Sequence, residues 1–135
     1  MKKLISILFL SMVVKSASAQ LDTLAYLKTF EQQKMQYIGQ PFSILLAAMG
    51  QVQPKSVWRG RNIKHKNQIH YCSFYFVNPN NMQTIGTIYM TIDWQTSILL
   101  DDINYYTNRN HYNFTSEERL FYGNKIIKDI KVFVY

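Results

Sequence analysis

The hydrophobic positions of residues 38–50 recur at the spacing of an α-helix. Four apolar side chains stand at i, i+3, i+4 and i+7: Phe42, Leu45, Leu46 and Met49. Gly39 can end a preceding helix, Pro41 can begin the next one, and Gly50 can end it. The pattern predicts a short helix whose apolar stripe lies on another apolar element, and the aromatic run of residues 69–77 is the best partner for it.

A longer helical pattern precedes this one, over residues 21–37. Its apolar side chains share one broad face: Leu24, Leu27, Phe30, Met35 and Ile38. Asp22 or Thr23 can cap its N-terminus. Because only a short link separates this helix from the next, the two predict an αα-hairpin.

Strand patterns follow the helices. Residues 56–59 predict a short strand, and residues 60–67 predict a polar turn. Residues 68–77 alternate, with Cys72, Phe74 and Phe76 on one side and Ile69, Tyr71, Tyr75 and Val77 on the other. Both sides are apolar enough for a central strand.

A strong turn signal at residues 78–81 leads into a further strand, residues 84–94. Its inner side carries Ile88, Met90, Ile92 and Trp94, and its outer side carries Thr87, Tyr89, Thr91 and Asp93. Residues 126–135 predict the last strand, with one apolar side made of Ile126, Ile130, Val132 and Val134.

Residues 95–110 allow two interpretations. Residues 98–100 suit a strand, whereas residues 97–106 suit one or two helical turns. We favour a short strand followed by a polar loop that carries tyrosines. After this segment, Thr115 and Glu118 have the spacing of a capping box, which predicts a short helix over residues 116–122.

The order of these elements predicts an α+β fold, in which an N-terminal αα-hairpin packs on an antiparallel sheet of about four strands and a short helix precedes the last strand. Helices followed by strands, with Gly39 and Pro41 between the helices, resemble the repeat unit of β-lactamase inhibitory proteins and of small outer-membrane assembly lipoproteins over residues 21–94. The resemblance implies a small exported domain that binds another protein. The lipid-bearing cysteine of the second group has no counterpart behind the apolar leader of this sequence.

The first residues have the pattern of a signal peptide. Lys2 and Lys3 precede an apolar run over residues 4–14, and Ala17-Ser18-Ala19 is a small-residue cleavage signal. The apolar run is shorter than the roughly 20 residues that a membrane-spanning helix needs. We therefore expect a signal peptide over residues 1–19, cleavage near Ala19, and a single exported domain over residues 20–135 without a transmembrane segment. Its location would be periplasmic or secreted.

Charge and cysteine content narrow the picture further. The three lysines of the leader account for part of the formal charge of +7, and removing them leaves +4. This mild excess of positive charge does not by itself indicate a nucleic-acid ligand, and export disfavours such a ligand. Cys72 is the only cysteine, so no intrachain disulfide can form. A buried, inert thiol is the preferred interpretation of Cys72, and an intermolecular disulfide or a nucleophile is the alternative.

A basic stretch over residues 55–66 is the candidate binding site. Its candidate partner-binding residues are Trp58, Arg59, Arg61, Lys64 and Lys66. One interpretation is a docking surface for something acidic, such as a partner protein or an anionic glycan. The other, which we favour, is a solvated hairpin edge whose lysines discourage association between strands.

Reactive constellations are not evident in the sequence. His65, His70 and His111 lack the spacing of a metal site, and no nucleophile or phosphate-binding motif occurs, so neither a metal nor a cofactor is expected. His70 and Cys72 lie two apart on a predicted strand, which would place them on one face. An enzyme would need titratable groups that converge, for example His70 with Asp93 or Asp102.

These observations favour a small exported, non-enzymatic domain that acts by contact with another protein. An inhibitor, an immunity-type protein or an envelope accessory protein are its concrete forms. The alternative is a carrier or sensor of a small apolar or glycan ligand. That alternative expects a pocket between helices and sheet, lined by aromatic side chains and Met90. Twenty aromatic residues (10 Tyr, 8 Phe and 2 Trp) suit either packing or recognition.

Overall fold

A computed structural model describes residues 22–135, so the predicted signal peptide lies outside the described residues. The chain begins with a helix over residues 22–32 and a short 3₁₀ turn, η1 (Lys34–Gln36). The remaining elements are α2 (Phe42–Ala48), β1 (Ser56–Arg59), β2 (Gln68–Tyr75), η2 (Pro79–Asn81), β3 (Ile88–Leu99), α3 (Leu100–Asn110), α4 (Ser116–Gly123) and β4 (Ile127–Val134).

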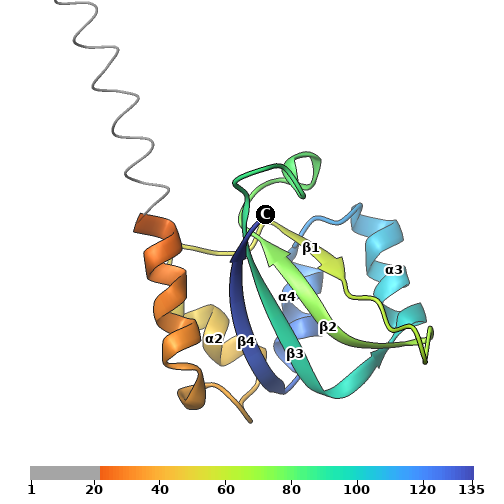
Figure 1. The fold of residues 1–135 in the computed structure, drawn as a ribbon. Helices are drawn as coiled ribbons and strands as arrows, with labels where there is room; N and C mark the ends of the chain where they lie inside the picture. The colour runs from red at the N-terminus through yellow and green to blue at the C-terminus, as the bar shows by residue number, and fades with distance from the viewer. Residues whose placement is uncertain (1–21) are drawn as a thin grey trace, which may run out of the picture.

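The four strands form one antiparallel sheet in the order β1-β2-β3-β4. Figure 1 shows α2 and α4 behind this sheet and the helix of residues 22–32 beside β4. The helix α3 lies near the N-terminal end of β2. In the described part of the chain no helix covers the face of the sheet turned toward the viewer. The α+β fold predicted from the sequence is therefore confirmed, with every strand joined to its neighbour in chain order.

The helix α2 packs as its apolar stripe predicts. Phe42, Leu45 and Met49 are fully buried, whereas Ile44 on the opposite side is half exposed. Gly39 and Gly50 adopt φ angles of +84° and +61°, which side-chain-bearing residues rarely tolerate, so these glycines permit the chain reversals on either side of the helix. The Phe42 ring meets the ring of Phe74 on β2 at 4.7 Å, which confirms the predicted contact between helix and strand.

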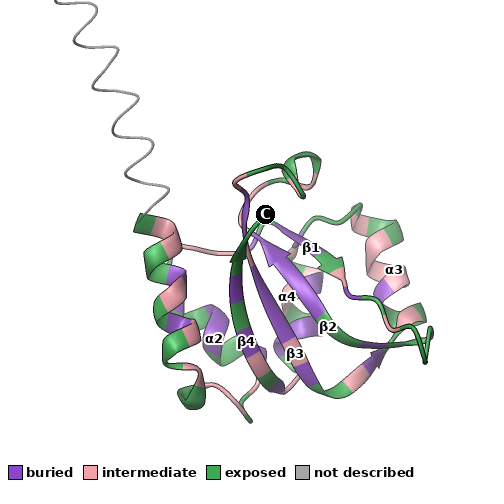
Figure 2. Cartoon of the chain, viewed as in Figure 1, coloured by how far each residue is buried: buried purple, intermediate pink, exposed green. Residues whose placement is uncertain are grey.

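Phe74 is the centre of the core. Three rings stand edge-on to it at 5.4–6.1 Å between centroids: Trp94, Phe114 and Tyr122. Together with Phe42, these rings bring α2, β3, α4 and the segment before α4 into contact with one side chain of β2. Edge-to-face pairs are stabilised beyond the burial of their area, by about 0.5–1.5 kcal/mol each. Figure 2 shows buried residues along the middle of the sheet and on the inner sides of the helices.

Both outer strands are partly covered by other segments of the chain. Residues 39–42 run beside the start of β4, where the Gly39 amide donates to the Ile127 carbonyl at 2.8 Å and the Phe42 amide to that of Lys125 at 2.9 Å. Further along β4, the Lys28 ammonium donates to the Val132 carbonyl at 2.7 Å. At β1, residues 112–114 provide similar bonds. These contacts use backbone groups that would otherwise be free to pair with another chain.

The predicted sides of the strands are correct except where the ladder is irregular. Ile69 was expected on the side of Tyr71, but it is 1% exposed and belongs to the core. The partners of β2 jump between Ile69 and Tyr71, from Ile98 to Asp93, so the alternation is interrupted there. A second irregularity lies opposite Trp94 and buries Ile127 in β4, where Ile126 was expected to face inward. In both places, the change of side buries an isoleucine.

The favoured prediction for residues 95–110 is wrong in its second half. β3 continues to Leu99, and residues 100–110 form the helix α3 where a polar loop was expected. Asp101 and Asp102 occupy its first turn and Arg109 its last turn, which suits the helix dipole. Only Ile103 is buried, so the apolar pattern is too weak to reveal the helix.

The first predicted helix is also shorter than expected. The α-helix ends at residue 32, and Met35, assigned to its apolar face, is 78% exposed in η1. The chain must turn here because Gly39 pairs with β4 at Ile127. Leu27 and Phe30, which precede the turn, are buried as predicted.

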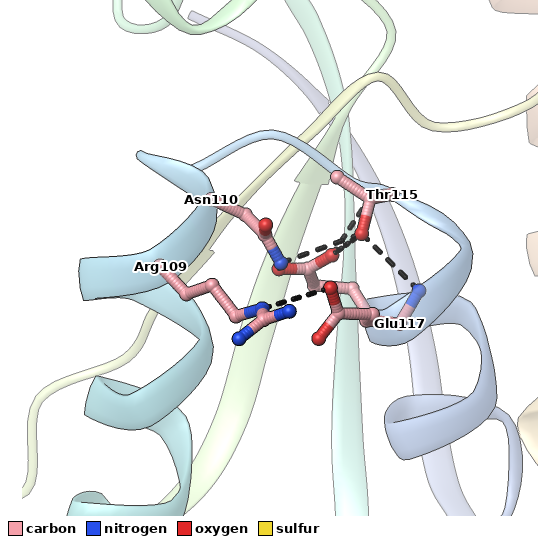
Figure 3. Close-up of polar contacts among 5 residues, drawn as sticks. Arg109, Asn110, Thr115 and Glu117 are labelled. Atoms are coloured by element: carbon pink, nitrogen blue, oxygen red, sulfur yellow. Dashed lines mark hydrogen bonds and ion pairs between the residues drawn. The ribbon is translucent and has the colours of Figure 1, made fainter.

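The capping box at the start of α4 is confirmed and joins this helix to α3 (Figure 3). The Thr115 hydroxyl accepts a hydrogen bond from the Glu117 amide at 3.1 Å, and the Glu118 carboxylate accepts one from the Thr115 amide at 2.9 Å. Glu118 also accepts from the Asn110 side chain at 2.6 Å, and Arg109 pairs with Glu117 at 3.0 Å. The buried Glu118 is therefore satisfied by groups from both helices.

Replacing Phe74 with alanine should lower the free energy of unfolding by about 3–5 kcal/mol, because the cavity left at the centre of the core cannot close. Phe133 on β4 is 42% exposed and offers a matched control. Its replacement with alanine should cost about 1 kcal/mol. Urea unfolding of both variants measures the difference, and equal losses would contradict the central position of Phe74.

Replacing Thr115 with alanine should destabilise the protein by about 1 kcal/mol, because the first turn of α4 loses its capping oxygen. Thr115→Ser keeps that oxygen and should recover most of the loss. Thermal unfolding of the two variants tests this. A serine variant as unstable as the alanine variant would show that the methyl group, and not the cap, is responsible.

Candidate functional site

The structure divides the predicted site residues between two sides of the sheet. Trp58 pairs with Ser73 and Arg59 pairs with Cys72 in the β1–β2 ladder. Because paired residues project to the same side of a sheet and successive residues alternate, Trp58 projects to the open face and Arg59 does not. Trp58 stacks on Tyr112 at 4.9 Å between ring centroids. It is thus separated from the basic residues with which it was grouped.

Arg59, Arg61 and Lys66 line one shallow cavity of about 400 Å³, here called the basic pocket. The other lining residues are Asn62, Ile63, Ile69 and Leu100. Lys64 is exposed in the same loop but does not line the pocket. The basic pocket therefore combines three of the predicted cationic residues with an apolar lining.

Local hydrogen bonds shape the loop that carries the basic pocket. The Asn62 side-chain oxygen accepts from the amides of Lys64 and His65 at 3.1 and 3.2 Å, which turns the chain back toward β2. The Leu100 amide donates to the Asn67 carbonyl at 2.8 Å. This bond joins the loop to the start of α3, so the pocket lies between β2 and α3.

The cations of the basic pocket have no carboxylate partner within the described residues. The ion pairs found in residues 22–135 join Lys28 with Glu31, Lys34 with Asp129, Arg109 with Glu117, and Lys131 with Asp93 and Asp129. Asp101 and Asp102 begin α3 next to Leu100, yet neither forms an ion pair with the basic loop in this part of the chain. Positive charge is therefore left available to a partner.

A second cavity, of about 410 Å³, lies on the open face of the sheet and was not predicted as a site. Its lining comes from β2, β3, β4 and the last residue: Tyr71, Ser73, Tyr75, Tyr89, Thr91, Asp93, Lys131, Phe133 and Tyr135. We call it the open-face groove. Alternating outward tyrosines and hydroxyl residues in the predicted strands are the signal that could have revealed it.

The open-face groove is built from rows that cross the strands. Tyr75, Tyr89 and Phe133 are paired across the ladder and stack at 5.0 and 5.4 Å. The next row holds Ser73 and Thr91, whose buried hydroxyls are 3.2 Å apart. Burial raises the pKa of Tyr75, and the neighbouring Tyr89 and Tyr135 phenols raise it further. The groove therefore has an aromatic wall and a polar floor.

The histidines and the cysteine do not form a reactive group. His70 is exposed at the irregular position of β2, whereas Cys72 is fully buried, so the shared face expected for them is wrong. His70 lines neither the basic pocket nor the open-face groove. In residues 22–135, no three or more His, Cys, Asp or Glu side chains are grouped closely enough to hold a metal ion. Cys72 is buried, as the sequence interpretation expects. Burial raises the pKa of its thiol to about 12, so little of the reactive thiolate form is present at neutral pH.

The core around Met90 is packed with side chains of the chain itself. A cavity of about 290 Å³ lies elsewhere, where Thr23 of the first helix meets Phe76 and Ile88, and Met90 does not line it. Met90 is fully buried, and the rings of Phe42, Phe74 and Trp94 pack on one another in the same core. Such interiors leave little room for a ligand. The pocket lined by Met90 that the carrier alternative requires is thus not supported at this place.

Comparisons with protein-family models, curated proteins and solved structures give no match to this chain. The resemblance to β-lactamase inhibitory proteins therefore stays a prediction. Within residues 22–135, no helix has both the length and the apolar character needed to cross a membrane.

The buried Cys72 thiol should make the protein less stable at alkaline pH. The folded protein keeps this proton up to about pH 12, whereas the unfolded chain loses it near pH 9. Because the unfolded state then binds fewer protons, the free energy of unfolding should fall as the pH rises through this window. The slope from one group is on the order of 1 kcal/mol per pH unit.

The variant Cys72→Ala tests this prediction, since it lacks the thiol and keeps every tyrosine. Urea unfolding between pH 8 and pH 11 should show a shallower fall for the variant than for the original protein. Identical slopes would mean that the thiol ionises equally well in both states.

Proposed function

We propose that this protein is an exported, non-enzymatic domain that binds another protein through an acidic surface of that partner. The observation that carries the proposal is the basic pocket, in which Arg59, Arg61 and Lys66 converge without a carboxylate partner in residues 22–135. Lys64, exposed in the same loop, adds to the positive charge of this region. An inhibitor, an immunity-type protein or an envelope accessory protein would act in this way.

The composition of the basic pocket suits a partner that offers both charge and apolar surface. Ile63 is 93% exposed beside the arginines, and Ile69 and Leu100 form an apolar part of the lining. Arginine guanidinium groups can bind carboxylates with two parallel hydrogen bonds. An acidic side chain on the rim of a partner would meet Arg59 or Arg61, while an adjacent apolar side chain would cover Ile63.

Binding of this kind depends on several weak contributions. Exposed ion pairs are each worth about 0–1 kcal/mol, so one arginine alone would not hold a partner. A group of like charges also attracts an acidic partner over roughly 10 Å at physiological salt and increases the rate of encounter. The basic pocket would therefore contribute to both the rate and the specificity of binding.

Reversing two charges of the pocket tests the proposal. Arg59→Glu with Arg61→Glu should weaken binding to the partner at least about tenfold and leave the melting temperature unchanged, because neither side chain belongs to the core. The purified protein, immobilised, is exposed to an extract of exported proteins, and the retained proteins are identified and measured individually for affinity.

The matched control is Lys125→Glu with Lys128→Glu, which changes the net charge equally. Lys128 is exposed and Lys125 half-buried, and both lie outside the basic stretch and line neither the basic pocket nor the open-face groove. A partner that binds the original protein and the control, but not the arginine variant, supports the proposal. Equal retention on all three proteins would remove the basic pocket from the interface.

A further inference from the structure

Tyr71 lies flat on the chain at one end of the open-face groove. A Cβ atom built on Gly60 would meet three ring atoms of Tyr71, namely Cε1, Cζ and Cε2, at 2.5, 2.5 and 2.6 Å. A point almost equally distant from three atoms of a six-membered ring lies above the face of that ring. One face of Tyr71 therefore covers Gly60, and only glycine leaves room for it.

The opposite face of Tyr71 is available to a ligand. Tyr71 lines the open-face groove and is 36% exposed. Within the described residues no other aromatic ring is stacked on it, in contrast to Tyr75, Tyr89 and Phe133. Those three rings turn their faces to one another, so Tyr71 is the flat apolar plate of the groove.

The polar groups beside this plate both donate and accept hydrogen bonds. Ser73 and Thr91 place two hydroxyls, 3.2 Å apart, on the floor, where each is less than a tenth exposed. Asp93 pairs with Tyr71 across the ladder and supplies a carboxylate that accepts. Lys131 supplies an ammonium that donates, 3.8 Å from the Asp93 carboxylate. These groups suit a ligand that carries several hydroxyls.

The charges of the groove favour a neutral ligand. Its lining includes one carboxylate, Asp93, and one ammonium, Lys131, which offset each other. A strongly anionic ligand such as a nucleic acid would meet little net positive charge here, unlike at the basic pocket. A flat plate for the apolar face of a ring, next to hydroxyls and one carboxylate, is complementary to a sugar.

We propose that the open-face groove binds a neutral oligosaccharide, with one sugar ring stacked on Tyr71 and its hydroxyls bonded to Asp93, Ser73 and Thr91. The site lies on the side of the sheet away from α2 and α4, and shares no lining residue with the basic pocket. The two sites can therefore act independently.

Titration of the ¹⁵N-labelled protein with neutral trisaccharides tests the proposal. The probes are cellotriose, maltotriose and chitotriose. At least one of them should shift the amide resonances of Tyr71, Ser73, Thr91 and Asp93, with a dissociation constant on the order of 1 mM or lower. No shift with any of the three probes would overturn the proposal.

Variants of the plate distinguish a sugar site from a general effect on the sheet. Tyr71→Ala should weaken binding about tenfold or more, whereas Tyr71→Phe should retain most of it. Gly60→Ala keeps the tyrosine but displaces its ring, so it too should weaken binding. Tyr105→Ala on α3 is the control for the loss of an exposed tyrosine and should bind normally.

Two further outcomes are informative. Arg59→Glu with Arg61→Glu should bind the sugar unchanged, so a failure of the basic pocket and a failure of the groove can be told apart. An octamer of deoxythymidine serves as the nucleic-acid probe. Shifts at Tyr71 with this oligonucleotide, and none with the sugars, would assign the groove to bases and overturn the proposal.

Discussion

The packing of rings around Phe74 is the interaction on which the rest of this fold depends. Rings from α2, β3, α4 and the segment before α4 all approach one side chain on β2. Because edge-to-face contacts restrict both distance and angle, they fix where each element lies on the sheet. They also draw α2 and α4 to the same face, and no helix within residues 22–135 covers the opposite face.

This one-sided arrangement produces two surfaces with different chemistry. On one of them, the basic pocket collects arginine and lysine side chains where the β1–β2 loop meets the start of α3. On the other, the open-face groove presents tyrosines, hydroxyls and one offset pair of charges. A charged partner and a neutral ligand would thus be recognised at separate places on one small scaffold, without competition between them.

Much of the fold is predictable because its signals are local. The stripe of α2 and the capping box of Thr115 and Glu118 depend on residues a few positions apart, and both are found as predicted. The prediction errors occur where contacts with segments distant in sequence decide the side of a residue or the end of a helix. Ile69 changes side because it pairs with Ile98, and the helix of residues 22–32 ends early because the following chain must reach β4. The polar α3 has a single buried residue, Ile103, and hence no apolar pattern to reveal it.

The sequence alone determined three properties. Helices precede an antiparallel sheet, the apolar stripe of α2 enters the core of the protein, and Cys72 is buried among aromatic neighbours. These properties follow from periodicity and from the conformational preferences of glycine and proline, which act within one turn or one strand. Only the tertiary structure decided that Trp58 and Arg59 project to opposite sides of the sheet, and that the ring of Tyr71 lies flat on Gly60. Strand register decides both, and register is set by pairing between residues far apart in the chain, where a shift of one position moves every side chain to the other face.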